Sequence, residues 1–85
     1  MARIEWTEEA VRDLKVIEKQ VGRRILKKLS WFSENFETIV PEPLSGEFKE
    51  TYKLRVGDWR VIYTIENGVI VIQSIGHRRE IYKIQ

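Results

Sequence analysis

Residues 51–75 read TYKLRVGDWRVIYTIENGVIVIQSI, and this stretch decides the fold. β-Branched and aromatic residues gather there in three runs, at 51–56, 59–65 and 69–75. Both central positions of a type I′ turn need a positive φ, so Asn67-Gly68 between two apolar runs predicts a tight β-hairpin. Gly57-Asp58 predicts a second turn between the first two runs. The stretch therefore predicts a three-stranded antiparallel meander.

Before the meander, the apolar pattern is first that of a strand and then that of helices. Ile4 and Trp6 alternate with polar residues, which is typical of a short strand. Two amphipathic stripes follow, one at Ala10, Leu14, Ile17 and Val21, the other at Ile25, Leu29, Phe32 and Phe36. Because Gly22 separates the stripes, we expect an αα-hairpin with its break there. Two prolines and a glycine predict a connecting loop over 40–46.

The order β-α-α-β-β-β predicts an α+β fold, with the helical hairpin packed on one face of a small, mainly antiparallel sheet. A chain of 85 residues suits a single domain, 1–85. With no cysteine and one histidine, the sequence excludes a disulfide framework and argues against a metal site. It contains no apolar run of the ~18–20 residues that a membrane span needs, so we expect a cytoplasmic protein.

Positive charge is concentrated in the second part of the chain. Residues 1–50 carry nine basic and ten acidic side chains, whereas residues 51–85 carry six basic and three acidic ones. Strand alternation places Lys53, Arg55 and Arg60 on the face of the sheet away from the helices, here called the open face. Regular alternation along the third run adds Arg78 to that face, with Ile62, Ile70 and Ile72 among the cations. Such clustered cations repel one another unless an anion or an acidic partner offsets them.

Other candidate residues have two readings each. Arg23-Arg24 and Lys27-Lys28 lie at helical spacing and fit a solvated face with acidic neighbours better than a specific site. His77 adjoins an arginine, and histidine is a residue type that commonly takes part in proton transfer, but alternation from Arg78 directs it to the opposite face. Tyr82 can either stack on a nucleobase or close the core.

Residues 54–63, LRVGDWRVIY, followed by Ile75-Gly76-His77-Arg78 and Ile81-Tyr82, resemble the RelE toxins of the RelE/ParE superfamily. Ile4-Glu5-Trp6 and Pro43-Leu44-Ser45-Gly46 occur in the same order in that family, so the resemblance covers almost the whole chain. It implies the toxin of a type II toxin–antitoxin system, an mRNA interferase that cuts mRNA in the ribosomal A site and so inhibits translation. The resemblance further implies no cofactor, and a RelB-like antitoxin that holds the toxin inactive.

The resemblance also implies roles for individual residues. Metal-independent RNA cleavage uses the 2′-hydroxyl as nucleophile and needs a proton acceptor, positive charge on the phosphate and a proton donor. The matching catalytic residues are Arg60, Arg78, Lys53 and Tyr82. The residues expected to bind RNA or phosphate are Arg55, Arg79 and His77. Thr51 stands where well-studied relatives carry a lysine, which leaves the acid and the base open.

Two further expectations concern partners. Ile62, Ile70 and Ile72 among the cations predict a groove for an amphipathic antitoxin segment with acidic flanks. The main alternative function is that of a ParE-like toxin, a non-enzymatic inhibitor of DNA gyrase with the same fold. A third possibility is an interaction protein whose basic groove only receives an acidic helix.

Overall fold

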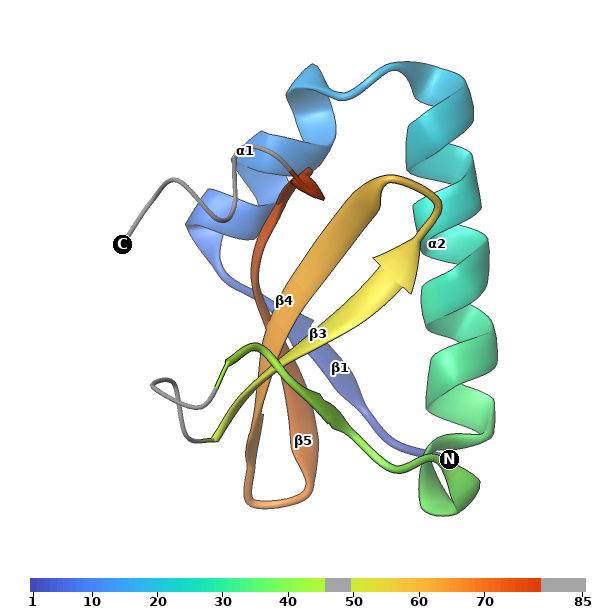
Figure 1. Ribbon diagram of the computed structural model, residues 1–85, viewed down its shortest axis with the longest axis vertical. Helices are drawn as coiled ribbons and strands as arrows, with labels where there is room; N and C mark the ends of the chain where they lie inside the picture. Colours follow the sequence, from blue (N-terminus) through green and yellow to red (C-terminus); the bar gives the residue numbers. More distant parts are fainter. Residues whose placement is uncertain (46–49, 79–85) are drawn as a thin grey trace.

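The computed structural model describes residues 1–45 and 50–78, which form two helices and a five-stranded sheet (Figure 1). The elements are β1 (Ile4–Trp6), α1 (Glu8–Val16), α2 (Lys19–Glu34), a 3₁₀ turn (Phe36–Thr38), β2 (Glu42–Pro43), β3 (Thr51–Val56), β4 (Trp59–Glu66) and β5 (Val69–His77). The strand order is β1-β5-β4-β3-β2, and only β1 is parallel to its neighbour. The α+β fold with a mainly antiparallel sheet is confirmed.

The turns and the helix break show where local sequence signals hold and where packing overrides them. Asn67 and Gly68 both have positive φ, 53° and 79°, as the predicted hairpin requires. The expected helix break at Gly22 is wrong, because α1 ends at Val16 and Gly22 lies inside α2. Gly22 is buried inside α2, and a Cβ there would lie 3.7 Å from Leu14 Cδ1, an ordinary contact distance, so the packing at this position does not require glycine.

The segment expected to be only a loop contains a strand. Glu42 pairs with Lys53, and Pro43 pairs with Tyr52, so that β2 adds a short antiparallel edge to β3. Proline is tolerated there because an edge strand leaves one side without ladder hydrogen bonds. The prediction of a loop over 40–46 is therefore wrong at these two residues. The strand pairing places Glu42 beside the basic side chains of β3.

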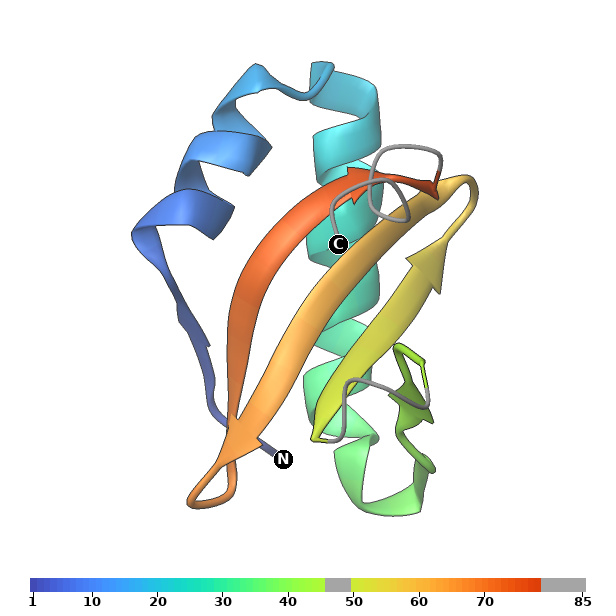
Figure 2. The same ribbon diagram turned by 60° about the vertical axis from the view of Figure 1, so that its left-hand side comes forward.

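The core lies between the helices and one face of the sheet (Figure 2). Tyr63 is 1% exposed, and its ring meets that of Phe32 edge-on at 5.2 Å between centroids. Burial, which disfavours the phenolate, raises the pKa of Tyr63 to about 12. The buried residues of β3 and β4 include Val56, Val61 and Tyr63, as alternation predicted.

A β-bulge in β5 reverses the alternation of that strand. Ile62 pairs with Ser74, but the next residue, Tyr63, pairs with Ile72, so Gln73 is an extra residue. Ile72 and Ile70 consequently face the helices, and both are 0% exposed. The expectation that they line an open antitoxin groove is wrong, because regular alternation does not include the extra residue. Of the three isoleucines, only Ile62 lies on the same face as the cations, and because it is 6% exposed it does not line an open groove either.

Side chains at the beginning and in the middle of the α1 region fix this bulge. Thr7 Oγ1 donates a hydrogen bond to the Gln73 carbonyl oxygen at 3.1 Å. Asp13 Oδ2 accepts one from the Ile75 main-chain N–H at 2.9 Å. Bulges disrupt the regular ladder and leave main-chain groups that need other partners. Thr7 and Asp13 supply those partners, and thereby hold the part of β5 that leads to Arg78.

Replacing Ile72 tests the corrected orientation of β5. Ile72→Ala should lower the free energy of unfolding by about 2–5 kcal/mol, because it leaves a cavity in the core. Val71→Ala, one residue away on the other face, should cost less than about 1.5 kcal/mol. Chemical denaturation measures both, and equal costs for the two variants would contradict the bulge.

Asp13 provides a second test. Asp13→Ala leaves the Ile75 N–H without its partner and should cost about 1–3 kcal/mol in unfolding free energy. Asp13→Asn keeps an acceptor oxygen and should cost clearly less. Hydrogen exchange of the Ile75 amide reports the bond itself: exchange should accelerate in Asp13→Ala, and unchanged protection would show that the carboxylate does not hold this strand.

Candidate nucleic-acid interface

Arg60 is packed against the turn that joins β3 to β4. Gly57 adopts a positive φ of 62° in this turn, and its carbonyl oxygen accepts a hydrogen bond from Arg60 Nη1 at 3.1 Å. The carbonyl oxygen of Trp59 accepts a second bond from the same nitrogen, also at 3.1 Å. Arg60 is 8% exposed, so it lies on the predicted face but against the turn instead of projecting into solvent.

The guanidinium of Arg60 retains an unused donor. Its buried Nε has no hydrogen-bond partner in the part of the chain that the structure describes. A buried donor without a partner costs about 1–3 kcal/mol, and such groups are rare in folded proteins. Across β5 the register partner of Arg60 is Gly76, which presents no side chain on this face. Arg60 Nε is therefore a buried donor that no described residue satisfies, at a position where the neighbouring strand adds no side chain.

Arg78 is attached to the same turn from the end of β5. Its main-chain N–H donates to the Asp58 carbonyl oxygen at 2.8 Å. Its Nη1 lies 4.0 Å from Asp58 Oδ1, and the side chain is 57% exposed. An exposed ion pair at this distance contributes little to stability. Arg78 is thus fixed through its main chain, while its guanidinium stays accessible.

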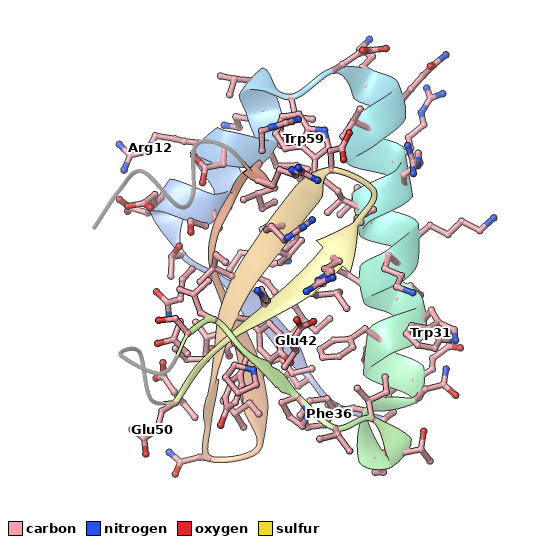
Figure 3. All side chains as sticks on the ribbon, viewed as in Figure 1. Arg12, Trp31, Phe36, Glu42, Glu50 and Trp59 are labelled. Atoms are coloured by element: carbon pink, nitrogen blue, oxygen red, sulfur yellow. The ribbon has the colours of Figure 1, made fainter. Side chains whose placement is uncertain are left out.

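Lys53 and Arg55 share one carboxylate, that of Glu42, which projects from β2 (Figure 3). Arg55 Nη2 donates to Glu42 Oε2 at 2.7 Å, and Lys53 Nζ lies 3.7 Å from the same oxygen. In the sheet register Arg55 stands opposite Arg60. Glu42 is not among the predicted site residues because the local sequence predicts a loop in place of β2; an acidic residue between two prolines is the available signal. The name basic face is used below for the four cations Lys53, Arg55, Arg60 and Arg78. Two carboxylates, those of Glu42 and Asp58, lie beside cations of this face.

Of the other predicted residues, the structure describes His77, which does not join the basic face. His77 pairs with Trp59 in the register and lies on the helix side, with the two rings nearly perpendicular and their centroids 5.6 Å apart. Arg79 and Tyr82 lie outside the described residues. Over 1–45 and 50–78 the side chains of His, Asp and Glu form no group of three or more that could hold a metal ion. Neither helix in those segments has the length and apolarity needed to cross a membrane.

Solved structures that match this fold include toxins and toxin–antitoxin complexes. A chain of the RelBE2 complex from Mycobacterium tuberculosis matches at 25% identity with a TM-score of 0.77, covering 91% of this chain and 98% of that one. A mutant of Escherichia coli toxin RelE in the free state matches at 26% and 0.73, covering 98% and 93%. The isolated E. coli RelE toxin, at 16% identity, covers 100% of both chains with a TM-score of 0.74.

The family comparison agrees with the fold. No curated protein sequence matches significantly. The family model described as the ParE toxin of the type II toxin–antitoxin system, parDE, matches residues 4–82. That range includes both helices, the whole sheet and every residue of the basic face. The chain therefore belongs to the ParE toxin family of the RelE/ParE superfamily and is a toxin of a type II toxin–antitoxin system.

Proposed function

We propose that this toxin is a ribosome-dependent mRNA interferase, which cleaves mRNA in the A site and so inhibits translation. The observation that supports this proposal most is the pair Arg60 and Arg78 at one turn, with the buried Arg60 Nε unpartnered among the described residues. Guanidinium groups match the geometry of phosphate oxygens.

The proposed reaction needs no cofactor. The 2′-oxygen attacks the adjacent phosphorus and forms a 2′,3′-cyclic phosphate, while the bond between phosphorus and the 5′-oxygen breaks. A base takes the proton of the 2′-hydroxyl, and an acid protonates the leaving 5′-oxygen. Arg60 and Arg78 stabilise the negative charge that accumulates on the phosphate oxygens in the transition state. DNA lacks the nucleophile and is not a substrate.

The other cations assist in distinct ways. Glu42 orients Lys53 and Arg55, and its charge offsets theirs when RNA is absent. When RNA binds, we propose that Lys53 stabilises the reacting phosphate and that Arg55 and Arg79 bind neighbouring phosphates. Tyr82 is proposed to stack on the nucleotide and to take part in proton transfer. No phosphate contact is proposed for His77, since it lies on the other side of the sheet beside Trp59.

The proposed partners are the ribosome, which presents the mRNA, and a RelB-like antitoxin. Support for the antitoxin comes from the structural match to the RelBE2 complex over 98% of the matched chain. Support for the ribosome comes from the chemistry of the basic face, whose cations suit a phosphate backbone.

Inhibition of DNA gyrase without catalysis is the second candidate function. It is favoured by the family model, whose description names ParE. Such an inhibitor needs no arrangement of arginines around a phosphate. The basic face therefore favours the nuclease, and experiment can separate the two functions directly.

Arg78→Ala provides that experiment. Primer extension on translated mRNA should show cuts within codons for the unmodified toxin, and cutting should fall by about 10²-fold or more when this donor is lost. Because Arg78 is exposed, unfolding free energy should change by less than about 1 kcal/mol. Arg60→Ala should also abolish cutting, with a larger loss of stability.

Arg3→Ala is the matched control, since Arg3 is an exposed cation, 74% accessible, that pairs with Glu5 at the opposite edge of the sheet. It should cut like the unmodified toxin. Intact mRNA together with inhibited DNA supercoiling by gyrase would contradict the nuclease and support the second candidate.

A further inference from the structure

The extra residue of β5, Gln73, carries an amide side chain on the open face. Its Nε2 donates a hydrogen bond to Thr64 Oγ1 at 3.0 Å, from β5 across to β4. Thr64 follows the buried Tyr63 in β4, so alternation directs Thr64, and the amide bound to it, away from the helices. Gln73 and Thr64 are both half-buried. The amide therefore belongs to the same surface of the sheet as the basic face.

The hydrogen bonds of Thr64 fix which end of the amide turns away from it. Thr64 Oγ1 donates its one hydroxyl hydrogen to Glu66 Oε2 at 2.9 Å, so toward Gln73 it can only accept. The amide nitrogen must therefore face Thr64, and the amide oxygen is turned away. Within the described part of the chain, Oε1 and the second Nε2 hydrogen of Gln73 form no hydrogen bond. A free acceptor and a free donor remain on one oriented amide.

The amide lies at a defined distance from the arginines that are proposed to bind phosphate. Arg60 and Thr64 are four residues apart in β4, which corresponds to about 13 Å along a strand. Between them, β4 and its neighbour β5 present the uncharged side chains of Ile62 and Ser74 on the open face (Figure 2). Cations hold a nucleic acid by its phosphates, whereas neutral donors and acceptors read the edges of its bases. RNA bound at the basic face would thus bring a nearby base over Gln73.

We propose that Gln73 reads one base of the mRNA close to the cleaved bond and selects adenine. Its Oε1 accepts a hydrogen bond from the N6 amino group of adenine, and its Nε2 donates one to N7. Guanine presents two acceptors at these positions and would leave Oε1 facing an oxygen. Unpaired bases of single-stranded RNA expose this edge to side chains. Thr64 is a positioning residue, because it orients the amide without touching the base.

The inference rests on the proposed cleavage of mRNA and adds the base that sets its preference. Primer extension measures it on messages that are identical except for one codon, with each base placed in turn at each position of that codon. For the unmodified toxin, adenine at one position should raise the cutting rate about tenfold or more over the other bases. In Gln73→Ala this ratio should fall below about threefold. Gln20→Ala, which removes an exposed amide from α2, is the matched control and should keep the ratio.

A modified base tests the contact itself. 7-Deazaadenine lacks the N7 acceptor, so the unmodified toxin should cut a message with this base at the preferred position several-fold more slowly. Gln73→Ala should cut the adenine and 7-deazaadenine messages at equal rates, since it has no donor for N7. A purely structural role of Gln73 predicts the same effect of the modified base in both proteins, and that result would overturn the inference.

Two further substitutions change the readout without removing the side chain at Gln73. Arginine pairs with O6 and N7 of guanine, so Gln73→Arg should move the preference from adenine to guanine. Thr64→Val removes the hydroxyl that orients the amide and should weaken the preference, whereas Thr64→Ser keeps a hydroxyl and should retain it. Circular dichroism checks that each variant is folded. The comparison of adenine with 7-deazaadenine in the unmodified toxin needs no variant.

The outcomes separate the inference from the proposed function. Messages that stay intact with the unmodified toxin would reject mRNA cleavage and the inference together. Cutting that is independent of the base at every codon position, or an adenine preference that is unchanged in Gln73→Ala, would overturn the inference and retain the cleavage.

Discussion

The extra residue in β5, Gln73, is the constraint on which the rest of the structure depends. By reversing the alternation, it places Ile70 and Ile72 in the core and leaves Ser74 and Gly76 on the open face. With regular alternation, β5 could not direct Ile70 and Ile72 into the core and also direct Ser74, Gly76 and Arg78 to the open face. Thr7 and Asp13 hold this segment from the α1 side. The helical layer thus contributes to the basic face without supplying any of its residues.

The cations of the basic face are paired with the carboxylates of Glu42 and Asp58, and these ion pairs are proposed to give way when RNA binds. Glu42 and Asp58 offset part of the repulsion between four cations. The Arg55–Glu42 and Arg78–Asp58 contacts are solvent-exposed and contribute modestly to stability, whereas the Lys53 side chain beside Glu42 is only 12% exposed. Arg60 differs because it is buried and fixed by two carbonyl oxygens. Arg60 is thus held in one orientation at the turn that also holds the main chain of Arg78, and donors that are oriented in advance favour transition-state stabilisation.

Sequence patterns predicted the parts of the fold that local chemistry determines. Asn67-Gly68 specifies its turn through backbone conformation, and the apolar faces of β3 and β4 follow from simple alternation. The bulge at Gln73 and the strand at Glu42 depend on contacts between distant segments, which a local pattern does not contain. The same limit applies to the basic face: its cations were identified, but the burial of Arg60 and the carboxylate of Glu42 were not.

The central claim is that the basic face promotes attack by a 2′-hydroxyl. The most direct measurement uses ribosomes that carry an mRNA with a single 2′-deoxynucleotide at the mapped cleavage position. A parallel control checks that the ribosomes stay intact. The account predicts that the all-ribose message is cut to a 2′,3′-cyclic phosphate and a 5′-hydroxyl, and that the deoxy-substituted message stays intact at that position. Cleavage of the deoxy-substituted message at the same bond, or products ending in a 5′-phosphate, would contradict it.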